Sequence, residues 1–235
     1  MDINDSKRVR ESYKIQGLRK FIGAKMAESL RDFPQGSGSA YICTEKFLEL
    51  KDELHAKDSN VTITSMLTKV TAEALKRHPV LNSALINEEF FIYDSVNIGV
   101  GIGTEEGIMT IVLKEAQSRD IFDISAELQE KIALMKAKKL QMTDMMGSTF
   151  TLSNMGMFCV EQVTPFLNPP ETAILAVGMT RKQVVVLEDD STAVKPMTCF
   201  SITINHAAVD GLHGGFFLQT IKEIVEDPKA HMGLF

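Results

Sequence analysis

The sequence has no tryptophan, only three cysteines and no long run of apolar residues. Cys43, Cys159 and Cys199 lie far apart and form no CxxC pair, which excludes a zinc ribbon and a thioredoxin-like redox motif. Sparse cysteines in an odd number are typical of reduced thiols in the cytoplasm. No segment approaches the roughly 18 consecutive apolar residues of a membrane-spanning helix, and the acidic start of the chain is unlike a signal peptide. We therefore expect a cytoplasmic protein that does not contact a membrane.

Positive charge is also scarce, because 25 Lys and Arg residues stand against 31 Asp and Glu residues, giving a formal net charge of −6 at pH 7. This balance disfavours a protein that binds nucleic acid, although a local basic patch is compatible with it. Hydrophobic residues make up 44% of the 235 positions, which is enough for a large core. No segment rich in proline, glycine and serine divides the chain. We expect an N-terminal arm over 1–15 and a single domain over 16–235.

Apolar periodicity switches between that of helices and that of strands along this domain. Helical spacing predicts helices over 18–31, 44–54, 62–77, 121–138 and 211–226, with Thr44 placed to cap the second. Alternation and turn residues predict strands over 41–43, 83–86, 90–93, 96–103, 108–112, 148–153, 173–177, 183–187 and 196–205. The segment 34–39 (PQGSGS) is predicted to be a flexible loop. Strands interleaved with helices predict an α/β fold, a two-layer sandwich in which helices cover a mixed β-sheet.

Several common site motifs are absent or fail on context. The run GVGIG at 99–103 has the composition of a dinucleotide-binding loop, but it lies inside a strand pattern and no helix opens after it. A Rossmann-type site is therefore rejected. The sequence also contains no GxxxxGK[ST] phosphate loop, no HExxH zinc motif and no GxSxG nucleophile elbow.

The segment 200–211 (FSITINHAAVDG) places a histidine at the end of a predicted strand. Phe200, Ile202 and Ile204 alternate with polar residues, and His206 continues the parity of the apolar set. Its ring is therefore expected to point into packed surroundings with little water. Such surroundings favour neutral imidazole, the form that can accept a proton.

Asp210 follows four residues after this histidine, at a turn into the last predicted helix. There it can cap the helix or orient neighbouring groups. The simpler interpretation of the pair is a buried structural histidine and an N-capping aspartate. A metal site made by His206, Asp210 and His213 is disfavoured, because the break at Gly211 disrupts helical spacing and no further ligand joins them.

A second segment, 147–156 (GSTFTLSNMG), carries a strand into a glycine-containing loop, with Ser153 at its end. Alone, Ser153 is best interpreted as a serine that caps a loop. A proline-rich segment, 164–175 (TPFLNPPETAIL), follows it.

Together these stretches resemble the catalytic domain of the dihydrolipoyl acyltransferase component of 2-oxo acid dehydrogenase complexes, a family that shares its fold with chloramphenicol acetyltransferase. The resemblance extends from about residue 17 to the C-terminus. It includes GLRK at 17–20, PVLNS at 79–83, VNIGV at 96–100 and the HxxxDG box at 206–211. The box alone is a weak pattern, whereas the ordered series at matching separations is a strong one.

The resemblance implies a direct acyl transfer between two thiols. His206 would act as general base on the thiol of coenzyme A or, in reverse, of dihydrolipoamide, and the thiolate would attack the thioester carbonyl. Ser153 matches the hydroxyl that donates to the oxyanion. Asp210 matches an aspartate with a structural and orienting role, and Arg19 matches its ion-pair partner.

The resemblance also implies a binding site for coenzyme A and an assembly. The positions that match coenzyme A contacts are Lys51, Thr64, Ser153, Asn154 and Gly178. Family members are trimers in which the histidine and the oxyanion hydroxyl come from neighbouring subunits. Many trimers assemble into cubic or dodecahedral cores through an apolar C-terminal tail, here 227–235, for which docking on a neighbour is favoured over folding back on its own subunit.

Some features depart from the family pattern. The histidine stands in Asn205-His206-Ala207 where the family usually has Asp-His-Arg, and Gly103 and Thr110 replace a common aspartate and proline. The 235 residues include no lipoyl or subunit-binding domain. Either this is an excised domain, or the lipoyl group arrives in trans on another protein together with the dehydrogenase components, or the acceptor differs.

Three alternatives stay open. A chloramphenicol acetyltransferase-like enzyme would acylate a small hydroxyl compound. A core-forming scaffold would have lost activity, which the altered neighbours of His206 would explain. A hydrolase would use Ser153 as its nucleophile.

Overall fold

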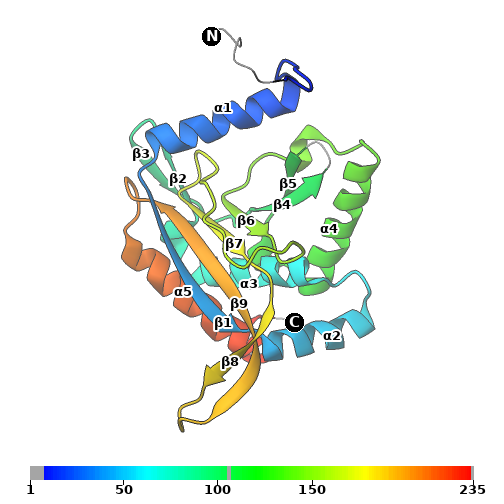
Figure 1. Cartoon of the computed structure of the whole chain (residues 1–235), viewed down its shortest axis with the longest axis vertical. Helices are drawn as coiled ribbons and strands as arrows, with labels where there is room; N and C mark the ends of the chain where they lie inside the picture. Colours follow the sequence, from blue (N-terminus) through cyan, green and yellow to red (C-terminus); the bar gives the residue numbers. More distant parts are fainter. Residues whose placement is uncertain (1–7, 105–106, 234–235) are drawn as a thin grey trace.

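The computed structural model describes residues 8–104 and 107–233 (Figure 1). Its helices are α1 (Gly17–Asp32), α2 (Glu45–Lys57), α3 (Ile63–Arg77), α4 (Ile121–Lys136), α5 (Gly211–Glu226) and α6 (Pro228–His231). Its strands are β1 (Gln35–Cys43), β2 (Ser83–Ile86), β3 (Glu89–Ile92), β4 (Ile98–Thr104), β5 (Gly107–Leu113), β6 (Phe150–Asn154), β7 (Ala173–Val177), β8 (Arg181–Val186) and β9 (Thr192–Asn205).

The main sheet has the strand order β1-β9-β7-β6-β4-β5, with β8 added beside β9. The sheet is mixed, because β6 runs parallel to both β4 and β7 while the other neighbours are antiparallel. Helices α2 to α5 pack on one face of this sheet, and α1 lies apart from them at the top of the view (Figure 1). Strands β2 and β3 form a separate two-stranded sheet. The predicted two-layer α/β sandwich is confirmed.

The two faces of the sheet differ in chemistry, and β6 shows the difference. Phe150 and Leu152 belong to the hydrophobic core under the helices, whereas Thr151 and Ser153 alternate to the opposite face. Asn154 returns to the helix side. Strand β6 therefore carries one predicted site residue toward the helices and another away from them.

The first strand is longer than predicted. Residues 35–39 of the segment expected to be a flexible loop instead form the first half of β1, and Gln35–Cys43 pairs with β9 along its whole length. Glycine and serine have low strand propensity, but β9 satisfies their backbone groups here. The prediction is wrong because the partner strand lies far along the chain, where local composition gives no sign of it.

Most other boundaries agree closely with prediction, and α5 and β7 agree at both ends. Thr44 does precede α2, but its side chain makes no capping hydrogen bond within the described chain. Its hydroxyl instead contacts the Pro196 carbonyl at 3.2 Å and the Thr198 hydroxyl at 3.2 Å. Thr44 therefore ties α2 to β9 rather than capping the helix.

The C-terminal tail folds back on its own subunit as far as the structure describes it. Helix α6 was not predicted; it contacts α2 and α5, and Lys229 forms an ion pair with Glu53 at 2.8 Å. Met232 is fully buried. The prediction that the apolar end docks on a neighbour now concerns Leu234 and Phe235, which lie outside the described residues. Among the described helices, none is long and apolar enough to cross a membrane.

Candidate active site

A cavity of about 560 Å³ opens where β6 and β7 end beside α2 and α3. Four of the five residues predicted to contact coenzyme A line it: Lys51, Thr64, Asn154 and Gly178. They come from α2, the first turn of α3, the end of β6 and the residue after β7, so the fold gathers positions that are dispersed in the sequence.

The Asn154 side chain joins two walls of this cavity. Its amide nitrogen donates to the Thr64 hydroxyl at 3.0 Å, and its oxygen accepts the Gly156 N–H at 2.9 Å. The first turn of α3 is fixed by a reciprocal capping box between Thr62 and Ser65. The end of β6 and the start of α3 thus keep a set distance across the cavity.

The chemistry of the lining suits a long anionic ligand with an apolar portion. Phe47, Val177 and Phe200 give apolar walls, and the N-terminus of α3 provides the positive end of a helix dipole. Among the described residues that line the cavity, Lys51 is the one lysine; its side chain is 25% exposed and contacts Asp52 at 2.9 Å. A cation and a helix N-terminus at one cavity can hold phosphate groups.

Gly178 has a packing reason to be glycine. A Cβ atom built on it would lie 2.0 Å from the Glu161 carbonyl oxygen, far inside contact distance. The Gly178 N–H also donates to the Cys199 carbonyl at 2.9 Å. The missing side chain therefore lets the loop after β6 approach the end of β7 and form the cavity rim.

Ser153 lies on the opposite face of the sheet and is not among the residues that line this cavity. Its nearest strand neighbour is Gly101, on which a built Cβ would lie 4.0 Å from the Ser153 hydroxyl oxygen. Within the described residues this hydroxyl makes no hydrogen bond, so it can donate to a ligand. Its predicted contact with coenzyme A stays a prediction.

His206 does not occupy the packed surroundings that its parity predicted, because its side chain is exposed in the single chain. Strand β9 ends at Asn205, and the chain turns at once, with the His206 N–H donating to the Pro34 carbonyl at 2.8 Å. The ring lies on the predicted side, over the backbone of Gly36 and beside Gly211. No later residue of the described chain continues the sheet to cover it.

Gly36 is a site residue that the sequence did not reveal. A Cβ built on it would lie 2.5 Å from His206 Cδ2 and 2.7 Å from Nε2. The histidine ring can rest on β1 only because this position has no side chain. Nothing in the sequence singles out Gly36, because the composition of 34–39 is typical of a loop and its pairing with β9 is not visible in the sequence.

Asp210 and Arg19 do not form the predicted ion pair within the described chain. Asp210 is exposed and occupies the N-cap position of α5, yet its carboxylate makes no capping hydrogen bond. Arg19 lies in the first turn of α1, where its Nη1 would be 3.9 Å from a Cβ built on Gly107. The prediction fails for one chain because α1 places Arg19 beside the β4–β5 hairpin.

His206 and Ser153 of one chain are far apart. In the sheet register Ser153 is the partner of Ala176 on β7, and Ala176 is the partner of Ser201 on β9. Ser201 precedes His206 by five residues. At about 3.3 Å per residue and about 4.8 Å per strand spacing, the separation is about 20 Å. One chain therefore cannot bring both groups to the same reacting carbonyl.

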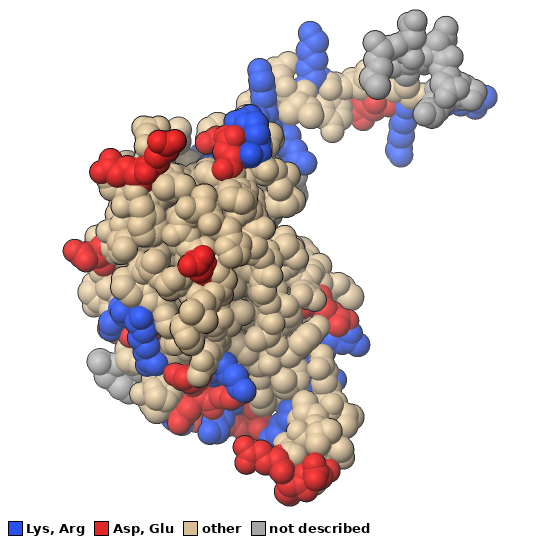
Figure 2. All heavy atoms as spheres, turned by 90° about the vertical axis from the view of Figure 1, so that its left-hand side faces the viewer, with Lys and Arg blue, Asp and Glu red and all other residues tan. Residues whose placement is uncertain are grey.

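The side of the molecule formed by β1 and α5 has few charges (Figure 2). Lys, Arg, Asp and Glu are sparse across the middle of this view. On α5, Leu212 and Phe216 are exposed by 65% and 50%. Large apolar groups on a charge-poor face next to His206 are typical of a surface that another protein chain covers.

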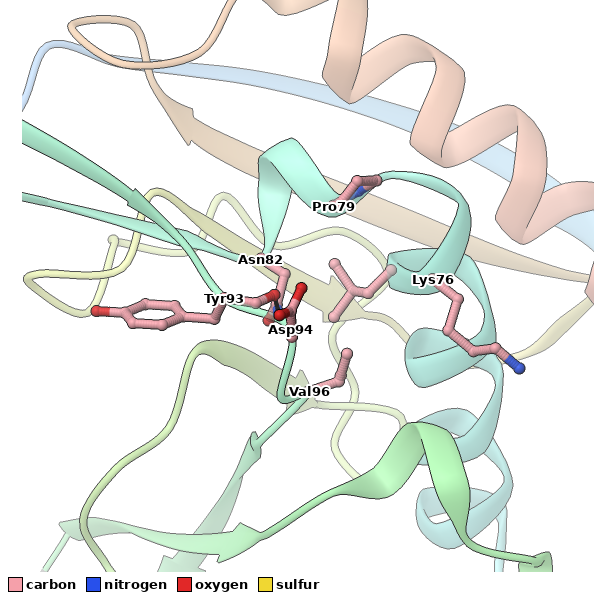
Figure 3. A pocket seen from close by; sticks show the side chains of 7 residues that line it. Lys76, Pro79, Asn82, Tyr93, Asp94 and Val96 are labelled. Atoms are coloured by element: carbon pink, nitrogen blue, oxygen red, sulfur yellow. Dashed lines mark hydrogen bonds between the residues drawn. The ribbon is translucent and has the colours of Figure 1, made fainter.

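A second hollow of about 320 Å³ lies between the end of α3 and the segment before β4 (Figure 3). The Tyr93 side chain points away from it, and the Asn82 amide is bonded to the Tyr93 and Ser95 carbonyls at 2.7 and 3.0 Å. Lys76 is paired with Glu73 at 2.9 Å. None of the predicted site residues lines this hollow, so the larger cavity is the candidate site.

Comparison with known proteins agrees with this geometry. The family model for the 2-oxoacid dehydrogenases acyltransferase (catalytic domain) matches residues 7–233. A chloroplastic dihydrolipoyllysine-residue acetyltransferase of a pyruvate dehydrogenase complex from Arabidopsis thaliana is 38% identical over 74% of this chain. This chain covers 37% of that protein, and it spans about half the length of the next two curated relatives, 50% and 55%.

Solved structures give the same answer for the fold. The structure of a probable dihydrolipoamide acetyltransferase from Listeria monocytogenes superposes with a TM-score of 0.87 at 30% identity, covering 92% of this chain and 94% of that one. Chloramphenicol acetyltransferase superposes with a TM-score of 0.55 at 16% identity, covering 86% and 94%. The chloramphenicol acetyltransferase-like fold predicted from the sequence is confirmed.

Proposed function

Because this chain belongs to the 2-oxoacid dehydrogenases acyltransferase (catalytic domain) family, we propose that it transfers acyl groups between coenzyme A and dihydrolipoamide. The observation that carries this proposal is the cavity that collects Lys51, Thr64, Asn154 and Gly178. Its cation, helix N-terminus and apolar walls match a ligand with phosphates at one end and an uncharged arm. The lipoyl group would be supplied in trans, and the dehydrogenase components would be further partners.

The reaction needs one general base and one oxyanion donor. The His206 imidazole takes the proton of the attacking thiol, and the thiolate bonds to the thioester carbonyl carbon. Imidazole is the side chain best suited to accept and return a proton near neutral pH, which is what this step requires of His206. The tetrahedral oxyanion accepts a hydrogen bond from Ser153, worth about 3 kcal/mol by comparison with other oxyanion donors. When the carbonyl re-forms, the departing thiolate takes the proton back from His206.

We propose that the active site forms between two copies of the chain. The separation of about 20 Å between His206 and Ser153 in one chain requires that each site combine His206 of one copy with Ser153 of the next. In a closed ring of three copies, every interface makes one such site. The charge-poor face around His206 would then be buried, which would exclude water from the ring. Asp210 would help orient this junction.

A larger core assembled from trimers is a second part of this proposal. The tail is held by its own subunit as far as Met232, which is fully buried, so docking on a neighbour would fall to Leu234 and Phe235, which lie outside the described residues. Sedimentation velocity would test this: a species much larger than a trimer is expected, and a trimer alone would contradict the larger core.

The direct test is acyl transfer from acetyl-coenzyme A to free dihydrolipoamide, with chloramphenicol as a competing acceptor. We expect a new thioester on dihydrolipoamide, no acetylated chloramphenicol, and a loss on the order of 100-fold or more in His206→Ala. Equal rates with and without His206 would refute the general base. A wild-type protein that binds coenzyme A but transfers no acyl group would support an inactive scaffold.

A serine-directed fluorophosphonate separates this proposal from a hydrolase. No covalent label on Ser153 is expected, because Ser153 donates a hydrogen bond and His206 activates a thiol. Stoichiometric labelling of Ser153 would point to an acyl-enzyme and contradict direct transfer.

A further inference from the structure

Glu171 is a buried carboxylate that the proposed reaction does not use. It lies between the Pro169-Pro170 turn and β7, and it is 2% exposed. Its two oxygens accept three hydrogen bonds: from the Ser148 hydroxyl at 2.5 Å, the Thr151 hydroxyl at 2.6 Å and the Asn168 amide at 2.8 Å. A buried carboxylate is costly unless its oxygens are bonded, so this group is held by a dedicated set of donors.

The three donors place Glu171 against the strand that carries Ser153. Thr151 lies two residues before Ser153 on β6, so the two side chains share one face of the sheet. On this face the position opposite Thr151 in β4 is Gly99, which offers no side chain to hold it. Ser148 precedes the same strand, and Asn168 also reaches the Thr151 hydroxyl at 3.3 Å. The carboxylate therefore anchors the Thr151 side chain on the face of β6 that carries Ser153.

The same carboxylate also anchors the loop between β6 and β7. Asn168 belongs to this loop, and the neighbouring Leu167 is tied to α1 and β1 through Ser29 at 2.8 Å and Gln35 at 3.2 Å. Directly after Glu171, the Thr172 carbonyl accepts the Asn205 N–H at 2.8 Å. Glu171 thus lies where the Ser153 strand, its following loop and β7 meet.

A carboxylate at this point imposes a direction on its partners. It only accepts hydrogen bonds, so the hydroxyls of Ser148 and Thr151 must both donate to it and cannot rotate. A glutamine would present one acceptor and one donor group instead, and at least one hydroxyl would have to turn. The carboxylate form is what keeps all three donors aimed at one centre.

We propose that Glu171 is a positioning residue for Ser153: through Thr151 and the 155–170 loop it fixes the depth and orientation of the Ser153 hydroxyl. This role rests on the proposed acyl transfer, in which Ser153 donates to the oxyanion. Displacement of such a donor by about 1 Å costs on the order of 100-fold in rate.

The test compares Glu171→Gln and Thr151→Val with wild type in the acetyl-coenzyme A assay. Both variants should lower kcat about 10- to 100-fold and leave KM for acetyl-coenzyme A within about twofold, because the residues that line the cavity are untouched. Thr151→Ser keeps the hydroxyl and should restore most of the rate. In a Ser153→Ala background, Glu171→Gln should add little further loss, since it acts through Ser153.

Glu73→Gln is the matched control. Glu73 is 8% exposed and paired with Lys69 at 2.8 Å in α3, but it is not placed at the proposed site. It should lower the midpoint of thermal unfolding and leave kcat unchanged. The positioning role is refuted if Glu171→Gln, like Glu73→Gln, lowers the midpoint of thermal unfolding and leaves kcat unchanged. It is also refuted if the loss in kcat of the double variant equals the product of the losses of Glu171→Gln and Ser153→Ala measured separately. Wild type without acyl transfer would refute the proposed function, and this role with it.

Discussion

At the residue scale, the proposed base depends on a position that has no side chain. The His206 ring rests on Gly36, and the strand that holds Gly36 was expected to be a loop. The HxxxDG box identified the histidine but not its support, because the two segments meet only when β1 pairs with β9. The sequence also could not show whether the His206 ring is buried. Strand parity indicates which face of the sheet a residue lies on, but it does not indicate whether another part of the protein covers that residue.

Gly36→Ala should therefore impair catalysis while leaving the fold intact. The new Cβ would lie 2.5 Å from His206 Cδ2, and the exposed ring can swing away without disturbing the core. We expect kcat to fall on the order of 10- to 100-fold with the unfolding midpoint nearly unchanged. Gly38→Ala, on the same strand with nothing within 4 Å, is the control and should behave like wild type. Equal activity of the two variants would show that the ring position does not matter.

The buried Glu171 predicts a pH dependence of stability. Burial raises the pKa of Glu171 above its ordinary value of 4.5, although hydrogen bonds from Ser148, Thr151 and Asn168 and the charge of Lys25 act in the opposite direction. Below 4.5 the carboxyl is protonated in both the folded and unfolded chain. As pH rises through the higher pKa of the folded state, the unfolded chain releases its proton more readily, so the free energy of unfolding falls.

Urea unfolding of wild type and Glu171→Gln over this range measures the effect. The wild-type free energy of unfolding should decline relative to the variant from about pH 4.5 upward and then level off. Parallel curves for the two proteins would mean that Glu171 has the same pKa in both states. A wild-type free energy of unfolding that rises relative to that of the variant as the pH increases from 4.5 would reverse the assigned direction.

At the element scale, the sequence predicted the long amphipathic helices and the buried strands most reliably. α5 and β7 agree in both bounds because their apolar patterns are strong and their neighbours reinforce them. Strand β1 begins before its predicted first residue, because pairing with the distant strand β9 outweighs its weak local strand propensity. Thr44 hydrogen-bonds to β9 and does not cap α2. The cavity residues were located through family resemblance. Periodicity alone could not have joined the first turn of α3 to the ends of β6 and β7.

The close approach of two loops at Gly178 gives a prediction for an element boundary. Gly178→Ala would place a Cβ 2.0 Å from the Glu161 carbonyl oxygen, so the loop after β6 must move away from β7. We expect a loss of about 1–3 kcal/mol in the free energy of unfolding and weaker coenzyme A binding by calorimetry. Gly23→Ala in α1, with nothing within 4 Å, should be neutral or stabilising. Unchanged stability in Gly178→Ala would mean that the loop is not constrained there.

At the scale of the whole molecule, the single chain presents two half-sites at opposite ends of one sheet. The cavity and Ser153 lie where β6 and β7 end, whereas His206 lies where β9 ends. Because β9 runs antiparallel to β7, these ends cannot meet in one copy. The exposed ring and the charge-poor face beside it are the expected features of a site that is completed by association (Figure 2).

Mixing two inactive variants tests this arrangement directly. His206→Ala chains keep Ser153, and Ser153→Ala chains keep His206, so a trimer containing both has one interface with both groups intact. With equal, random mixing about three quarters of trimers are mixed and each has one intact site in three, so about a quarter of wild-type activity should return. A site built within one chain would recover nothing, because every chain lacks one of its two groups. The two variants should be mixed both as preformed trimers and after unfolding and refolding them together. Activity that returns only after joint refolding would further show that the intact sites arise at new subunit contacts.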